Sequence, residues 1–305
     1  MPHNNHMDTI RVFMTFLQKL SDLTEEEFNK HLLPVCKVRR FGKKEVITRA
    51  GEIENHFNFI VKGLARKFYK KNHHEINTQI SLEGQMLLSQ ESFHSRQPSE
   101  YTIETIEPTT LVSISYDDAE KMFASSQRME HMGRIIVTYS MVIKDKWQMQ
   151  LIKMTPRERF ISFVTKNPEL MQRVPQKFLA SYLNIKPETF TRLKPLIASK
   201  RKKLPAKPAT KPEAPKKSKA AAGVMTPQRM SPAFFDYAVK YFQQFMPLSR
   251  AEMESLMQYC EFREFGKKEV VVREGEVDDY LNMVVRGLVR KYVKVDKGEV
   301  ILQLA

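Results

Sequence analysis

A chain of 305 residues is long enough to form two or more domains with cores of their own. The shares of hydrophobic residues (42%) and charged residues (28%) are typical of a soluble folded protein and exclude a disordered one. A formal net charge of +15 favours a polyanionic partner, nucleic acid first and an acidic membrane surface second. Without a long apolar run or a signal-peptide pattern, we expect a cytoplasmic protein with no membrane association.

The predicted first domain spans residues 8–126. Apolar residues at helical spacing, with an acidic helix start at 24–27, predict two short helices before residue 34. Short apolar runs separated by Gly or polar turns then predict strands at 45–48, 57–61, 65–69, 76–81, 101–106 and 110–115. Many short strands at this spacing indicate an antiparallel β-roll or jelly roll.

A short helix and then a long helix at residues 127–154 are predicted to follow. Along the long helix, apolar residues recur at alternating steps of three and four, which makes a narrow seam suited to a second helix. The residues of this seam are Met129, Met132, Ile136, Tyr139 and Ile143. The seam predicts a homodimer, and the alternative is a helix packed on its own β-roll.

Residues 155–194 are predicted to form a helical helix-turn-helix domain. Thr155 and Glu158 have the spacing of a capping box, with Pro156 at the first helical position. Further along, two apolar helical patterns are separated by Asn184, which tolerates a positive φ, and Pro187 suits the first turn of the second helix. This spacing is typical of a DNA-reading motif. The alternative is a pair of amphipathic helices packed in a bundle with no DNA role.

Residues 195–230 are rich in Lys, Pro and Ala, and they predict a basic linker. It either adds salt-dependent affinity by lying along DNA phosphates or serves only as a tether.

Residues 231–305 begin like the first domain. At an offset of about 224 residues, roughly 20 of 46 positions from Cys36/Cys260 to Ser81/Ala305 are identical, which indicates a duplicated domain. The copy ends before the second half of the roll. We therefore expect a truncated chain, a fragment that borrows strands from another copy, or a marginally folded unit.

The order of these parts resembles the Crp–Fnr superfamily of bacterial transcription regulators, in which a cyclic-nucleotide-binding-type β-roll precedes a dimerisation helix and a helix-turn-helix. The resemblance covers residues 8–194, and residues 231–305 resemble the start of a second roll. It rests on Phe41-Gly42-Lys43-Lys44-Glu45, Gly51-Glu52 and Gly63-Leu64 in the roll, and on residues 178–185 and 188–192 in the motif. The implied fold class is α+β.

The resemblance implies that Glu188 and Arg192 contact bases and that Thr189 and Thr191 flank them in the groove. Arg can pair with guanine and Glu with cytosine. The predicted DNA-binding residues are Gln176, Lys177, Lys186, Glu188, Thr189, Thr191, Arg192 and Lys194. The implied partners are double-stranded DNA, a second copy of the chain and RNA polymerase.

The ligand pocket departs from the family pattern. Relatives that bind cyclic AMP carry an Arg for the phosphate, whereas Pro98 or Ser99 takes that position here. A buried anion without a cation is costly, so we do not expect cyclic AMP to bind in the family's way. The candidate pocket residues are Glu91, Ser92, Arg96, Ser99 and Tyr101, and the effector is unidentified.

No cofactor, metal site or catalytic group is predicted. Cys36 and Cys260 are expected to be buried thiols, and His73 and His74 to be solvated hairpin residues. No nucleophile–base pair or carboxylate couple has a recognisable spacing, which argues against an enzyme. We therefore expect a sequence-specific DNA-binding regulator. The alternative is a module without a DNA role, built on duplicated β-rolls, that binds a protein or senses a ligand.

Overall fold

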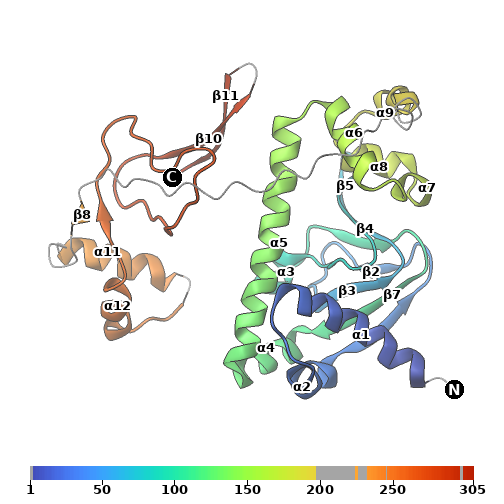
Figure 1. Cartoon of the computed structure of the whole chain (residues 1–305), viewed down its shortest axis with the longest axis horizontal. Coiled ribbons are helices and arrows are strands. Elements are labelled where there is room, and N and C mark those ends of the chain that lie inside the picture. The colour runs from blue at the N-terminus through green and yellow to red at the C-terminus, as the bar shows by residue number, and fades with distance from the viewer. Residues whose placement is uncertain (1–2, 197–223, 226–231, 245, 296–297) are drawn as a thin grey trace. The chain divides into compact units, whose positions relative to one another are not determined.

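The computed structural model describes residues 3–196, 224–225, 232–244, 246–295 and 298–305 (Figure 1). The chain divides into two compact units, residues 1–205 and residues 206–305. Of the predicted linker, only residues 195–196 and 224–225 are among those described.

The first unit begins with helix α1 (His3–Leu20) and the single turn α2 (Glu25–Glu27), followed by a π-helical turn (Phe28–Leu32) and a 3₁₀ turn (Leu33–Val35). The two predicted helices are confirmed. Thr24 starts α2 through a capping box, in which its hydroxyl accepts from the Glu27 amide at 3.1 Å.

Two antiparallel sheets form the β-roll, which is the architecture predicted for this region. One sheet has the order β1-β7-β3, with β1 (Lys37–Phe41), β7 (Thr109–Ser115) and β3 (His56–Lys62). The other has the order β2-β6-β4-β5, with β2 (Val46–Thr48), β6 (Thr102–Thr105), β4 (Ala65–Lys71) and β5 (His74–Ser81). The six predicted strands are confirmed, while β1 and the short helix α3 (Gln90–Ser95) are additions to the prediction.

Side chains alternate across the sheet β1-β7-β3 and serve two cores. Ile60 and Leu111 lie in the cluster between the two sheets, whereas the neighbouring Phe59 and Val112 lie in a cluster with α1 and α4. The same sheet therefore carries the roll interior on one face and a layer of helices on the other.

Helix α4 (Tyr116–Ser125) leads into α5 (Gln127–Lys153), which runs along the roll and on to α6 (Figure 1). The prediction that Met129 and Met132 belong to a dimer seam was wrong. Both are buried, at 0% and 4% exposure, in the core that α1 and the roll supply, and Ile136 packs partly against the same cluster. The alternative of a helix packed on its own roll therefore holds for the start of α5. Tyr139 and Ile143 are exposed, and a dimer contact through them stays a prediction.

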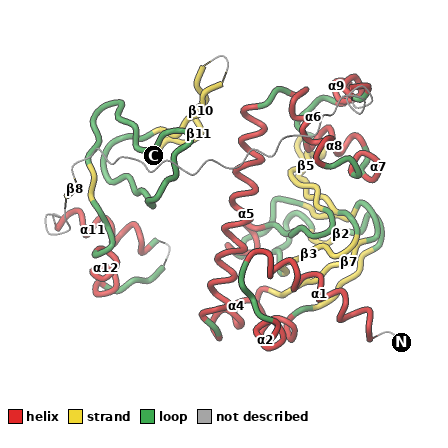
Figure 2. Tube along the Cα trace, in the orientation of Figure 1, coloured by secondary structure: helices red, strands yellow, loops and turns green. Residues whose placement is uncertain are grey.

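Four helices complete the first unit, namely α6 (Pro156–Lys166), α7 (Leu170–Arg173), α8 (Gln176–Tyr182) and α9 (Pro187–Leu193), and Figure 2 shows that this end of the unit is helical. The predicted capping box is confirmed, because the Thr155 hydroxyl accepts from the Glu158 amide at 3.3 Å. Phe160 and Phe190 meet edge to face in the core of this end.

The second unit contains β8 (Val224–Met225), α11 (Pro232–Gln243), α12 (Arg250–Met257), β9 (Phe262–Arg263), β10 (Arg290–Val295) and β11 (Gly298–Leu304). Its buried apolar cluster consists of Phe235, Ala238, Met253 and Met257. The strands β10 and β11 pair as an antiparallel hairpin.

Candidate functional site

The turn between α8 and α9 has the predicted backbone geometry. Asn184 has a φ of 51°, and its amide donates to the Ser181 carbonyl at 3.0 Å. The Ile185 amide donates to the Ala180 carbonyl at 2.9 Å, and Pro187 then occupies the first turn of α9. These two local predictions, at Asn184 and Pro187, are confirmed.

Helix α9 has one buried and one exposed side. Phe190 and Leu193 are buried in the cluster that includes Leu179 and Ala180 of α8. Of the predicted DNA-binding residues, Gln176, Lys177, Lys186, Glu188, Thr191 and Arg192 are exposed, and Thr189 and Lys194 are half-buried. The buried side therefore fixes α9 against α8 and leaves a polar surface on the outer side.

A buried arginine, Arg159, connects α5 to this turn. Its guanidinium donates to the carbonyls of Leu183 and Asn184 at 3.1 and 3.2 Å. It also donates to the carbonyls of Leu151 and Met154 at 2.9 and 2.7 Å. One side chain thus joins the end of α5 to the loop that sets the start of α9. The sequence gives no signal for this role, because all four acceptors are main-chain atoms.

Helix α8 packs against the hairpin β4–β5 of the roll. The Arg66 guanidinium lies over the rings of Phe68 and Phe178, 3.9 Å from each ring centroid. The Ser181 hydroxyl accepts from the Asn77 amide at 2.9 Å. These contacts fix the helix-turn-helix segment on the roll through side chains of both.

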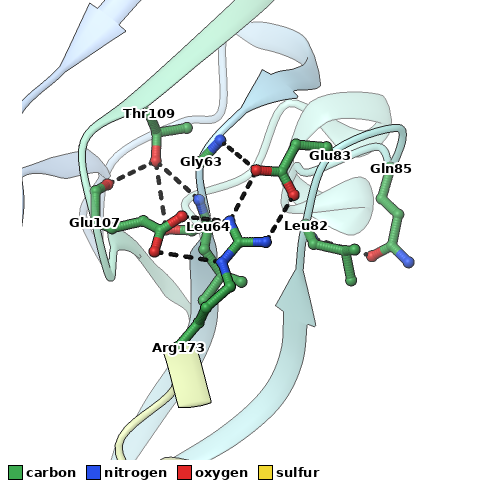
Figure 3. Close-up of polar contacts among 8 residues, drawn as sticks. All are labelled: Gly63, Leu64, Leu82, Glu83, Gln85, Glu107, Thr109 and Arg173. Carbon is green, nitrogen blue, oxygen red and sulfur yellow. Dashed lines mark hydrogen bonds and ion pairs between the residues drawn. The ribbon is translucent and has the colours of Figure 1, made fainter. Parts of the chain in front are cut away.

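Arg173, at the end of α7, makes a second connection to the roll (Figure 3). It donates to both carboxylate oxygens of Glu83, at 2.8 and 3.0 Å, and it also pairs with Glu107. Glu83 accepts in addition from the Gly63 amide at 2.9 Å. Burial acts to raise the pKa of Glu83, but the hydrogen bonds from Arg173 and backbone amides outweigh it and lower the pKa to about 2.

Two of the predicted ligand residues, Ser92 and Ser99, belong to a hydrogen-bonded cluster that contains a buried carboxylate of the chain itself. Glu54 is 1% exposed, and its carboxylate accepts from the Thr48 hydroxyl at 2.9 Å and from the Ser89 amide at 3.4 Å. Ser92 and Ser99 are both buried, Ser92 accepting from the Glu54 amide and Ser99 donating to the Ser89 hydroxyl. An anionic ligand here would meet the Glu54 charge, and burial raises the pKa of that carboxyl.

The other candidate ligand residues have different roles. Arg96 donates to the Glu54 carbonyl at 2.8 Å, and its guanidinium lies 4.0 Å from the Tyr116 ring centroid. Glu91 is exposed on α3, and Tyr101 meets Tyr69 edge to face. Arg96 therefore stabilises the loop at residues 54–55.

Lys67 is a buried cation that sequence reasoning missed. It is 6% exposed, donates to the Leu88 carbonyl at 3.3 Å, and lies 5.3 Å from the Tyr101 ring centroid. Burial lowers its pKa to about 8, and the nearby charge of Lys144 acts in the same direction. Its surroundings in the sequence read as an ordinary hairpin, which explains why no pattern pointed to it.

The described residues contain no group of His, Cys, Asp and Glu side chains that could hold a metal ion. Cys36 is buried, which raises the pKa of its thiol to about 12, and Cys260 is half-buried. His73 and His74 are exposed at the β4–β5 turn. Among the helices described, none combines the length and apolar character that a membrane crossing requires.

Comparison with known proteins gives one family match and several structural neighbours. Residues 38–126 match the family model of the cyclic nucleotide-binding domain. The c-di-GMP responsive global regulator CLP of Xanthomonas campestris is 15% identical to this chain, with a TM-score of 0.47. The match covers 57% of this chain and 93% of the CLP chain. FixK2 from Bradyrhizobium japonicum is 16% identical over 55% and 86% of the two chains, with a TM-score of 0.46.

Catabolite activator protein from Thermus thermophilus is 16% identical over 61% of this chain and 88% of its own, with a TM-score of 0.38. No curated protein matches the chain. The family match spans the β-roll from β1 to the end of α4, and α5 to α9 lie outside it.

Proposed function

We propose that the chain is a sequence-specific DNA-binding transcription regulator of Crp–Fnr type, in which α9 enters the major groove. The observation that carries the proposal is the two-sided character of α9. Phe190 and Leu193 anchor the helix in the core, while Glu188, Thr191 and Arg192 face solvent. Among the described residues, none forms a hydrogen bond or ion pair with the side chains of these three, which leaves them available for base edges.

Charge and symmetry support the proposal. The formal net charge of +15 suits a polyanion, and exposed Lys177 and Lys186 flank the reading helix on α8 and at the turn. Two copies of α9 would contact successive major grooves in a homodimer. The exposed residues Tyr139, Met141 and Ile143 on the middle of α5 are suited to that dimer contact.

In this proposal, α5 transmits the effect of an effector from the roll to the DNA-binding helices. The start of α5 is buried against the roll through Met129 and Met132, and its end is joined to the α8–α9 turn by Arg159. A shift of α5 in response to an effector would therefore move the turn and change the spacing of the two reading helices.

The test is the sequence discrimination of Arg192→Ala. A duplex is selected from a random pool with the wild-type chain, and affinities for it and for a scrambled duplex are measured at fixed salt. We expect the variant to lose about 1–3 kcal/mol of discrimination, which is the value of a bidentate arginine–guanine contact. The matched control is Arg157→Ala, because Arg157 is exposed on α6 and is outside the predicted set. Equal discrimination by wild type and Arg192→Ala would refute the assignment.

A second candidate function, binding of a protein partner, is favoured by the second unit. Leu281 and Leu288 there are 99% and 78% exposed. Apolar side chains in such positions are typical of protein interaction surfaces. A salt-sensitive smear with no discrete protein–DNA complex in a mobility assay would favour this function over the first.

A further inference from the structure

A cavity of about 100 Å³ lies between the roll and the helices α1, α3, α4 and α5. Its lining is almost entirely apolar, and it includes none of the candidate ligand residues named from the sequence. The buried side chains of the lining include Phe13, Leu88, Phe93, Ile114, Met122 and Met132. This space is separate from the hydrogen-bonded cluster around Glu54.

The lining contains few polar side chains. They are Gln90 and His94 on α3 and Ser140 on α5. The Ser140 hydroxyl already donates to the Ile136 carbonyl at 3.1 Å. Burial lowers the pKa of His94, and no Asp, Glu, Lys or Arg lines the space.

A water molecule in the apolar part of this space would lack the two to four polar partners that it needs. A charged ligand would lose its hydration without a counter-charge. An apolar cavity of about 150 Å³ in another protein binds benzene, so a somewhat smaller space can accept a small ring. The chemistry of the lining therefore selects an uncharged apolar ligand.

We propose that this cavity is a binding site for a small uncharged apolar molecule of about the size of a six-membered ring. Any single polar substituent of that molecule would lie near Gln90, His94 or Ser140. The proposal concerns binding and stands without a DNA-binding role for the chain.

The cavity is also next to the element through which we propose that DNA binding is controlled. Met132, Gly133, Ile136, Val137 and Ser140 of α5 all line it. Helices α4 and α5 pack closely at Gly133, since a Cβ there would lie 2.7 Å from the Phe123 ring of α4. A ligand would therefore press on α5 and Phe123, and this link to DNA rests on the proposed function.

The test uses fluorobenzene as the probe and the full chain, with binding followed by ¹⁹F NMR. Ala119, on α4, lines the cavity, and Ala119→Leu should fill it. Ala124→Leu is the matched control, because Ala124 is exposed on the same helix. We expect saturable binding by wild type and Ala124→Leu, and affinity at least about tenfold weaker in Ala119→Leu. Absence of saturable binding to wild type, or equal binding by Ala119→Leu, would overturn the proposal.

A measurement on the wild type guards against misfolding of the filled variant. With ¹³C-labelled methionine methyl groups, fluorobenzene should shift the signals of Met122 and Met132, which line the cavity. The signals of Met253 and Met257, in the core of the second unit, should not move. Shifts confined to methionines outside the cavity would overturn the proposal even if binding is saturable.

Discussion

The β-roll of the first unit and its partial copy in the second share a sequence pattern but differ in structure. Their turns are the same. Lys44 and Lys268 have φ values of 61° and 66°, and Gly63 and Gly287 have values of 104° and 111°. The Glu45 carboxylate accepts from the Gly42 amide at 2.6 Å, and the Glu269 carboxylate accepts from Gly266 at the same distance.

The strands of the two regions differ, and the difference follows from their partners. In the first roll β3 pairs with β7 and β2 pairs with β6. The matching residues of the second unit, 270–272 and 280–286, form no strand. By contrast, β4 and β5 pair with each other, and their counterparts β10 and β11 do form a hairpin. Turns therefore form from local sequence, whereas a strand needs a paired neighbour for its backbone groups.

The burial of equivalent side chains also differs between the two units. Leu64 is 0% exposed in the cluster beneath α6–α9, while the equivalent Leu288 is 78% exposed. A leucine at the same place after the same glycine turn contributes to a core in one unit and to the surface in the other. The four predictions that follow test this contrast, beginning with the largest effect.

Hydrogen exchange should separate the two regions most strongly. Amides of Phe57 and Phe59 lie in the β3–β7 ladder and should exchange only when the roll unfolds. The amides at 281–284 have no such ladder and should exchange at least about a thousandfold faster. Exchange measured by NMR or mass spectrometry gives both rates in one sample. Equal protection would mean that residues 280–286 are paired in solution.

Truncation to alanine should lower the free energy of unfolding much more at Leu64 than at the equivalent Leu288. Leu64→Ala leaves a cavity in a packed core and should lower the free energy of unfolding by about 2–5 kcal/mol. Leu288→Ala removes an exposed side chain and should change it by less than about 0.5 kcal/mol. Urea unfolding followed by circular dichroism reports both units, and Trp147 fluorescence reports the first. A cost above 1 kcal/mol for Leu288→Ala would show that this side chain is covered.

Substitution of alanine for the equivalent Gly63 and Gly287 should give a smaller difference in stability between the two units. Both glycines have a positive φ, so alanine should be strained by about 1–2 kcal/mol at either position. At Gly63 a Cβ would also lie 2.5 Å from the Pro108 carbonyl oxygen, whereas at Gly287 it meets no atom within 4 Å. Gly63→Ala should therefore cost about 1–3 kcal/mol more than Gly287→Ala in the same unfolding measurement. Equal losses of stability in the two variants would contradict the predicted contact at Gly63 and leave backbone strain as the whole cause.

Features that depend on neighbouring residues can be predicted from the sequence, whereas features that depend on distant residues cannot. The helix start at 24–27, the capping box at Thr155 and the positive φ at Asn184 follow from residues within four positions, and they are confirmed. The strand β1 escapes prediction because its polar sequence pairs with β7, about 70 residues further on.

The candidate sites show the same limit. A seam of apolar residues predicts that α5 has a partner, but spacing does not say whether the partner is a second copy or α1 of the same chain. Arg159, Glu54 and Lys67 are buried by elements distant in sequence, so no local pattern reveals their roles. Exposed α9 residues were predictable because a short amphipathic helix defines its own outer side.

The smallest predicted effect concerns the pairing of Glu83 with Arg173, which joins the roll to α7 just beyond the stretch that is duplicated. The pKa of Glu83 is lowered to about 2 from an unfolded value of 4.5, so its contribution to stability is present above pH 4.5 and is lost as the pH falls toward 2. Because the Glu83 side chain is 36% exposed, solvent screening limits this contribution to about 1 kcal/mol. Arg173→Gln also removes the pair with Glu107. Urea unfolding followed by Trp147 fluorescence should therefore show that this variant is less stable by at least that amount at pH 6, and that its stability falls less steeply between pH 4.5 and 2. The control is Arg250→Gln, which breaks an exposed pair with Glu254 in the second unit and should leave both readings unchanged. The same pH dependence in wild type and Arg173→Gln would contradict the assignment of the lowered pKa to Arg173.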